Sequence, residues 1–219
     1  MDVFKIIKTK TLIYKIMKTR IVTLITLATI ALSISVAHAT TTNNNNTNVT
    51  AVNVAVNNIS KIEASGNVEV YIVNGDKDEV KVYDKYYEQN ALVQGKDGVL
   101  RISSYAKDKL VVLVTVADLR AITAYDNAVV KSKGKLSAIE LNVNLNNNAS
   151  AQLDLNVFAA NFTVNNRSTA NLSGTVNDYN VNYSQSSTIN KTDLVATNVT
   201  EKNTTKEAAR LAEERMASL

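Results

Sequence analysis

The sequence predicts an all-β protein of stacked repeats, with a β-hairpin region before the repeats and a short helix after them. Blocks of alternating apolar and polar residues, each interrupted by a small polar corner, recur about every 20 residues through 139–189, a spacing typical of stacked-repeat folds. Alternating runs also flank Asn74-Gly75, a strong hairpin signal. The chain contains no Pro, which favours ladders that use every backbone N–H.

The N-terminus has the pattern of an export signal, and we assign residues 1–39 to it. Residues 17–20 are a basic segment, 21–36 are apolar apart from Thr and Ser, and 37–39 form a small-x-small cleavage site. The alternative is a retained membrane anchor, but the apolar run is short for a membrane span. We expect translation to start at Met17 and no stable membrane span to remain after the leader is removed.

The composition of the remaining chain excludes several classes of function. The leader holds six of the 24 basic residues and one of the 20 acidic residues, which leaves 18 basic and 19 acidic residues and a net charge of −1. We therefore expect no nucleic-acid partner, which would need a clustered basic face. The only His is His38 in the leader, and there is no Cys. His/Cys metal sites, thiol nucleophiles and His-dependent triads are excluded, and we expect no cofactor, no metal and no enzymatic activity.

Residues 40–58 are rich in Asn and Thr and are predicted to form a tether, in which alternating Val52, Val54 and Val56 are compatible with a first strand. Two alternating runs then predict a hairpin around Asn74-Gly75. Their apolar positions are Val68, Val70, Ile72, Val80 and Val82.

A second turn at 95–98 places 91–94 against 100–103 in a second predicted hairpin. Residues 110–116 are nearly all apolar and β-branched, which predicts a strand covered on both faces.

The repeats begin at Leu119. Their predicted corners contain Asn, Asp and Ser, which tolerate left-handed backbone angles, and stacked Asn residues can pair in amide ladders. The corners are 126–128, 147–149, 167–169 and 185–187. The predicted inward residues are Ile139, Leu141, Val143, Leu145, Leu153, Leu155, Phe162, Val164, Leu172, Val176, Val181, Ile189 and Val199. One repeat cannot cover its own apolar face, so each needs neighbours on both sides.

Residues 201–219 are predicted to form a capping helix over the last repeat. Residues 204–207 have the pattern of a capping box, and apolar residues follow at helical spacing as far as Leu219. Such a helix would shield an exposed strand edge. The alternatives are a partly formed final repeat or a frayed tail.

Three segments resemble the auto-transporter adhesin head GIN domain family: 62–75, 98–102 and 112–122. The resemblance covers about residues 59–200. It implies an exported bacterial protein, mainly of Gram-negative envelopes, and a right-handed β-helix-like solenoid for 59–200. It supplies no catalytic residue. This chain departs from the family pattern in having Ala117 where Pro is usual, Asn- and Ser-rich corners where Ser-Gly is usual, and a helical segment in place of the final repeats.

Four tyrosines in the first β region are the predicted ligand contacts: Tyr83, Tyr86, Tyr87 and Tyr105. An exposed Tyr combines a rigid apolar ring with a polar tip and can stack on sugars or peptides. The alternative is that these rings cover the sheet or pair across strands.

Two charged groups allow similar alternatives. Asp76, Asp78 and Glu79 have carboxylates that can ligate a cation, although a solvated turn is the simpler interpretation. A local basic patch is compatible with a surface that faces lipopolysaccharide or acidic glycans, although a solvated surface is the simpler interpretation. It comprises Arg120, Lys131, Lys133 and Lys135.

These observations predict a non-catalytic exported envelope or cell-surface protein, in the periplasm, on the outer-membrane surface or outside the cell. We expect an adhesin-like module whose solenoid face binds surface glycans or envelope proteins. One alternative is a β-helix polysaccharide lyase or hydrolase, which would need aligned carboxylates; the repeats offer Asp126, Glu140, Asp154, Asp178 and Asp193. A purely structural assembly role, through stacking of the solenoid ends, is the other.

Overall fold

The computed structural model describes residues 52–54, 56, 58–84, 91–206, 210 and 215–216, all within the compact unit Asn48–Leu219. The predicted leader, the first part of the predicted tether, and Tyr86 and Tyr87 lie outside the described residues. Within the described part of the chain, no helix has the length and apolar character needed to cross a membrane.

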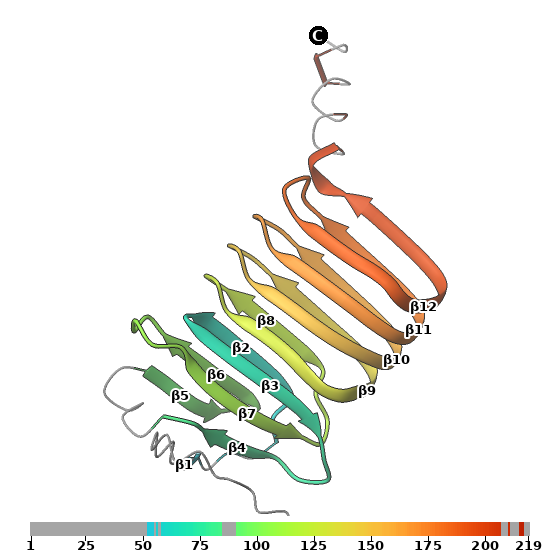
Figure 1. Cartoon of the computed structure of the whole chain (residues 1–219). Coiled ribbons are helices and arrows are strands. Elements are labelled where there is room, and N and C mark those ends of the chain that lie inside the picture. Colours follow the sequence, from blue (N-terminus) through green and yellow to red (C-terminus); the bar gives the residue numbers. More distant parts are fainter. Residues whose placement is uncertain are drawn as a thin grey trace, which may run out of the picture. The chain divides into compact units, whose positions relative to one another are not determined.

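The all-β prediction is confirmed, because the described residues form a 12-stranded sheet (Figure 1). The first seven strands are β1 (Val52–Val54), β2 (Lys61–Gly66), β3 (Val68–Asn74), β4 (Glu79–Val82), β5 (Ala91–Lys96), β6 (Val99–Ser104) and β7 (Leu110–Val116). The last five are β8 (Ala121–Tyr125), β9 (Val129–Leu145), β10 (Ser150–Val164), β11 (Thr169–Tyr183) and β12 (Thr188–Asn203).

Nine strands form a mixed sheet in the order β1-β4-β7-β3-β9-β8-β2-β6-β5. Its central pairs are parallel, whereas β1–β4, β4–β7 and β5–β6 are antiparallel. The two ends of this path approach one another, because a Cβ built on Gly95 in β5 would lie 2.7 Å from the Val56 side chain, just beyond β1. The sheet is therefore barrel-like and nearly closed.

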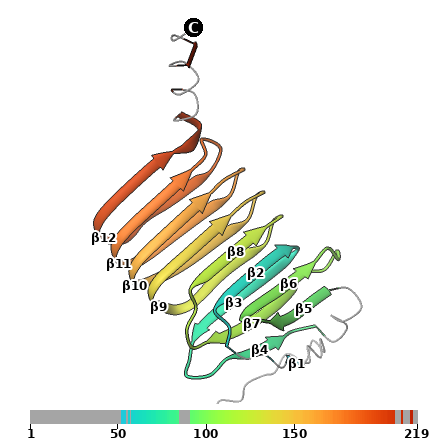
Figure 2. The ribbon, with the colours of Figure 1, turned by 180° about the vertical axis from the view of Figure 1, so that it is seen from behind.

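The strands β9 to β12 form a stacked parallel series. Each is long enough to contribute to two layers. The first part of β9 pairs with β3, and its last residues pair with β8. Layer A contains β4, β7, β3 and the first parts of β9–β12. Layer B contains β5, β6, β2, β8 and the last parts of β9–β12. Figures 1 and 2 show the series from opposite sides.

The apolar core lies between the two layers. Along β10 the buried side chains alternate from Ala151 to Val157, two successive residues then face outward, and the alternation resumes at Ala160. This bend passes the chain from layer A to layer B. Phe162 and Tyr179 are the largest fully buried residues, with ring centroids 5.8 Å apart.

Ten of the thirteen predicted inward residues are buried in this core: Leu141, Val143, Leu145, Leu153, Leu155, Phe162, Val164, Leu172, Val176 and Val181. Ile189 is partly buried against it. Two predictions are wrong. Ile139 is 84% exposed, because it occupies the bend of β9, where the alternation slips by one residue. Val199 is 52% exposed, because β12 pairs only with β11.

The predicted hairpin around Asn74-Gly75 is wrong. β3 and β4 do not pair with each other, because β7 lies between them, parallel to β3 and antiparallel to β4. The strong apolar character of β7 favours this interior place, with a partner on each edge. Its inward residues are buried and its outward residues are partly buried, so the predicted cover is complete on the core face alone. The second predicted hairpin is confirmed as β5–β6, with Leu92 opposite Ser103.

A helical turn at 204–206 follows β12 directly. The amides of Thr205 and Lys206 both donate to the Asn203 side-chain oxygen, each at 3.1 Å. Asn203 therefore caps this turn, in place of the predicted capping-box residue Thr204. Arg210, Arg215 and Met216 are also helical, and Met216 is 69% exposed; the remainder of the predicted helix lies outside the described residues.

Candidate binding surface

The corners between repeats carry a polar ladder along the stacking direction. Asp126, Asn127, Asn147, Asn148 and their successors in the next corner adopt left-handed angles, with φ between 51° and 69°. The Asn147 amide donates to the Asp126 carboxylate and accepts from the Asn166 amide, each at 3.2 Å. The predicted amide ladder is confirmed here, and its hydrogen bonds are directed along the stack.

A second amide ladder runs along the outer side of layer B. The Asn161 side-chain amide donates to Asn142 at 3.1 Å, and that of Asn180 donates to Asn161 at 3.1 Å. Asn161 also donates to Glu140 at 3.2 Å. These amides satisfy one another, so this face offers a ligand few free donors.

The outer side of layer A differs, because it begins with an aromatic and cationic cluster. Strand register places Tyr71 beside Leu113 on one side and Lys131 on the other. The ammonium groups of Lys131 and Lys133 each lie 5.7 Å from the centre of the Tyr71 ring, within range of a cation–π contact. We call Glu69, Tyr71, Lys109, Lys131 and Lys133 the Tyr71 cluster.

Glu69 holds the Tyr71 cluster together. Its carboxylate accepts hydrogen bonds from the Lys131 ammonium at 2.7 Å, the Tyr71 hydroxyl at 2.8 Å and the Lys109 ammonium at 3.4 Å. These donors, Lys131 first, lower the pKa of Glu69 to about 2. The same contact raises the pKa of Lys131 and that of Tyr71. Glu69 is therefore an anion at neutral pH, and Lys133 has no carboxylate partner among the described residues.

A shallow polar groove of about 350 Å³ continues across the same side of layer A. Its lining comprises Gln152, Asn171, Leu172, Ser173, Asn190 and Asp193. Strand register aligns Lys131, Gln152, Asn171 and Asn190 on four consecutive strands. Together with Tyr71 they form a continuous row, which we call the layer A row.

Two of the four tyrosines predicted to contact a ligand, Tyr83 and Tyr105, lie in the described part of the chain. Tyr83 extends β4, where its backbone amide donates to the Val111 carbonyl at 2.9 Å, and its side chain is 37% exposed. Tyr105 follows β6, donates its hydroxyl to Asp126 at 3.1 Å and is 72% exposed. No contact joins these two rings in the described part of the chain, and Tyr86 and Tyr87 lie outside it. Whether any of the four contacts a ligand stays a prediction.

Asp78 has a structural task that its sequence context did not reveal. Its two carboxylate oxygens accept from the Ile59 amide at 2.6 Å and the Ala117 amide at 3.0 Å. The side chain thus joins the entry to β2 and the exit from β7. Asp76 remains exposed, and Glu79 accepts from Lys81 at 2.9 Å. Among the described residues, no group of three or more His, Cys, Asp or Glu residues is placed to hold a metal ion.

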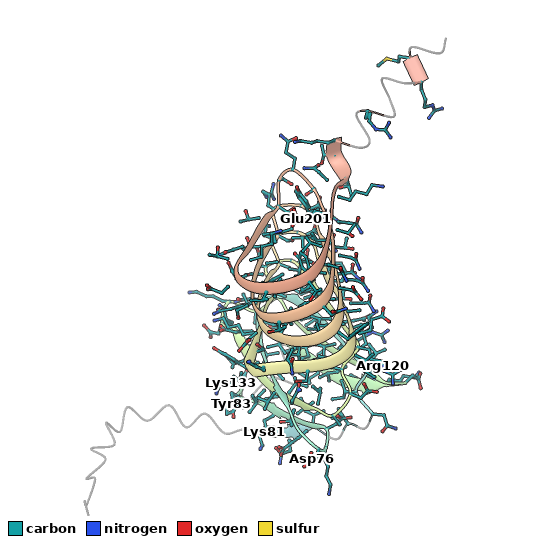
Figure 3. The ribbon with its side chains drawn as sticks, turned by 90° about the vertical axis from the view of Figure 1, so that its right-hand side faces the viewer. Asp76, Lys81, Tyr83, Arg120, Lys133 and Glu201 are labelled. Carbon is teal, nitrogen blue, oxygen red and sulfur yellow. The ribbon has the colours of Figure 1, made fainter. Side chains whose placement is uncertain are left out.

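The predicted basic group separates in the structure. Arg120 pairs with Asp118 at 2.6 Å, which lowers the pKa of Asp118 and raises that of Arg120. Figure 3 shows Arg120 and Lys133 on opposite sides of the ribbon. Of the predicted basic group, the lysines of β9 contribute to the layer A surface and Arg120 does not.

The five acids considered for a lyase or hydrolase lie in three different places. Asp126 is at a corner. Glu140 on β9 and Asp178 on β11 are both register partners of Ala159 on β10, at the bend of these strands. Asp154 and Asp193 share a layer A column with Ser173 between them. Each pair is two strand spacings apart, roughly 9–10 Å along the sheet.

The comparisons with known proteins agree with this fold. Three solved structures align with 69% of this chain and 76% of their own. They are a "putative adhesin" from Parabacteroides merdae (18% identity, TM-score 0.54), a "putative adhesin" from Parabacteroides distasonis (16%, 0.51) and a "putative lipid binding protein" from Parabacteroides distasonis (12%, 0.50). At these identities the likeness shows the fold alone. A comparison with the curated proteins found no match.

The family comparison covers most of the chain. The profile described as "Putative auto-transporter adhesin, head GIN domain" matches residues 58–215, which include β2 to β12. The resemblance noted in the sequence is thereby confirmed: the chain belongs to the auto-transporter adhesin head GIN domain family.

Proposed function

We propose that this protein is a non-catalytic, exported envelope or cell-surface protein, an adhesin-like module that binds glycan or protein partners on the outer side of layer A. The stacked series then acts as a right-handed β-helix-like solenoid, a rigid scaffold that presents an extended face. The observation that carries the proposal is the layer A row, in which aligned polar side chains cross consecutive strands in a groove. Family membership supports export and adhesion.

The charges of the described residues support a binding role over a catalytic one. The carboxyl groups of Glu63, Glu69 and Asp118 each have a pKa lowered by hydrogen-bonded basic partners, so these three groups are held as anions. A general acid in glycoside hydrolysis needs the opposite, a raised pKa.

A polysaccharide hydrolase remains the second candidate because Asp154 and Asp193 flank the layer A groove. Their strands are roughly 9–10 Å apart, at or beyond the upper end of the spacing of inverting enzymes and well above that of retaining enzymes. The groove is also open, so neither carboxylate is held in a dry pocket. This geometry favours binding without cleavage.

A purely structural role through end-to-end stacking is disfavoured by the last strand. Leu172 and Val181 in β11 face the core, whereas the next strand places Lys191 and Glu201 over this end of it. These two side chains form an ion pair, and the Lys191 ammonium lies 5.8 Å from the buried Tyr179 ring. Figure 3 shows Glu201 at the end of the stack. This ion pair places two charges in the otherwise apolar end of the stack, which discourages the addition of another copy.

The experiment that tests the proposal combines binding with turnover. The chain without its leader is applied to a glycan array and to isolated outer-membrane fractions, and the same preparation is incubated with acidic and neutral polysaccharides. We expect retained ligand and no new reducing ends. Blank binding with clear release of reducing ends, abolished by Asp193→Asn, would replace the adhesin-like function with the hydrolase.

A further inference from the structure

Resting on the proposed function, we infer that the ligand of the layer A row is an oligosaccharide with a carboxylate at one end, and that this carboxylate binds at Lys133. The row contains three kinds of side chain in a definite order. The Tyr71 ring and Lys131 come first, and the amides of Gln152, Asn171 and Asn190 follow. At about 4.8 Å per strand, the five positions span roughly 19 Å, a length that suits several linked sugars.

Two of the three amides of this row, those of Gln152 and Asn171, are wholly available to a ligand, whereas the Asn190 side-chain oxygen already accepts hydrogen bonds from Thr192. Among the described residues, the side chains of Gln152 and Asn171 make no hydrogen bond to another protein group, whereas Asn142, Asn161 and Asn180 on layer B bond to one another. An amide carries both donors and an acceptor, as do the hydroxyl groups of a sugar. The contrast between the two layers therefore identifies layer A as the side with free hydrogen-bonding capacity.

The charge around Tyr71 explains why one end of the ligand should be an anion. Lys109, Lys131 and Lys133 face a single carboxylate, Glu69, which leaves a formal local charge of +2. Glu69 is occupied by Lys131 and Lys109, so Lys133 is the ammonium left for an incoming carboxylate. The adjacent Tyr71 ring offers an apolar surface for the C–H face of the same sugar.

The far end of the groove explains why the remaining sugars should be neutral. Asp193 lines the groove beside Asn190, and Asp154 precedes it in the same column. Lys135 is the register partner of Asp154 on β9, so Asp193 is the carboxylate left to repel a chain that carries an anion on every sugar. The charge distribution selects a localised negative charge over a uniform polyanion or a flat anionic membrane. Figure 3 places Lys81, Tyr83 and Lys133 on the same side of the ribbon.

The test uses sialyllactose, which has one terminal carboxylated sugar, with lactose as the neutral control. Binding is followed by NMR titration of the chain without its leader. We expect sialyllactose to bind at least tenfold more tightly than lactose, and Lys133→Gln to weaken sialyllactose binding about tenfold. Gln152→Ala should weaken both sugars severalfold. The matched controls, Lys96→Gln and Gln94→Ala on the exposed side of β5, should change neither affinity.

Three outcomes would overturn the inference. If sialyllactose binds no better than lactose, the ligand's carboxylate is not recognised. If Lys133→Gln and Lys96→Gln have equal effects on affinity, the carboxylate does not bind at Lys133. Capture of phosphatidylglycerol vesicles without sialyllactose binding replaces the glycan with a membrane. In each case glycan-array or envelope binding that survives these variants leaves the proposed function standing, whereas its complete absence ends the proposed function itself.

Discussion

Replacing Gly174 with alanine gives the sharpest test of how closely β10 and β11 are stacked. Gly174 has φ of +96°, and it is the register partner of Leu155. A Cβ at this position would lie 2.1 Å from the Leu155 carbonyl oxygen and 2.7 Å from its amide nitrogen. These are backbone atoms of the neighbouring strand, so the clash is relieved only by moving β10 and β11 apart.

The magnitude follows from two separate costs. A left-handed backbone costs a non-glycine residue about 1–2 kcal/mol, and overpacking against a rigid neighbour costs typically 1–3 kcal/mol more. Gly174→Ala should therefore lower the free energy of unfolding by roughly 2–5 kcal/mol, a large share of the ~5–15 kcal/mol of a typical domain. Gly134 is the matched control, because its φ is +84° and a Cβ there meets nothing within 4 Å. Gly134→Ala should bear only the backbone cost, about 1–2 kcal/mol.

The assay is urea denaturation of the chain without its leader, followed by far-UV circular dichroism. Similar slopes in the two variants would show that only stability has changed. Equal losses of stability in Gly174→Ala and Gly134→Ala would refute the reasoning, because they would show that no neighbouring backbone approaches Gly174.

Three further predictions use the same denaturation assay. Asp78→Ala should lower the free energy of unfolding by about 2–4 kcal/mol, since two backbone amides lose a charged acceptor. The control Asp76→Ala should change it by less than about 0.5 kcal/mol. Similar values for both variants would show that Asp78 does not join β2 to β7. The pKa of Glu69 is lowered from 4.5 to about 2, so its carboxylate stabilises the fold above pH 4.5, and this contribution is lost as the pH falls from there towards 2. In Glu69→Gln the free energy of unfolding should therefore fall less steeply over that interval. The same pH dependence in the variant and the parent protein would contradict the lowered pKa of Glu69. The Tyr179 hydroxyl is buried and has no hydrogen-bond partner among the residues that the structure describes, and burial raises the pKa of this group. Tyr179→Phe should therefore leave the free energy of unfolding unchanged or raise it by up to about 1–2 kcal/mol, while Phe162→Ala should lower it by about 3–5 kcal/mol. A marked loss of stability in Tyr179→Phe would reveal a partner for the hydroxyl.

Local patterns in the sequence were sufficient for the strands and corners of the repeats. Alternation identified the inward residues of β10 and β11, and short polar residues identified the corners, three of which adopt left-handed angles; the described corner at 185–187 does not. These features depend on a residue and its immediate neighbours, so a single sequence carries them. Ile139 shows the limit, because a bend that turns two successive residues outward leaves no mark in a two-residue period.

Strand partners and the surface site depend on contacts between distant segments. The run before Asn74-Gly75 gives no indication that β7 will insert between β3 and β4. Tyr71 was missed as a site residue for the same reason. Its alternation predicted an outward side chain, but the lysines around it arrive with β9, about 60 residues later. The clustered tyrosines attracted attention through proximity in sequence, whereas the register of layer A decides which side chains meet.

The most direct test of the stacked arrangement is disulfide formation between introduced cysteines, because the chain has no native Cys. Thr169 and Thr188 are register partners on β11 and β12, at a separation that suits a disulfide. The account predicts that Thr169→Cys with Thr188→Cys forms an intramolecular disulfide. It also predicts that Thr169→Cys with Ile189→Cys does not, since successive residues of a strand face opposite sides. A disulfide in the second pair and none in the first would contradict the register on which the stack and its binding face depend.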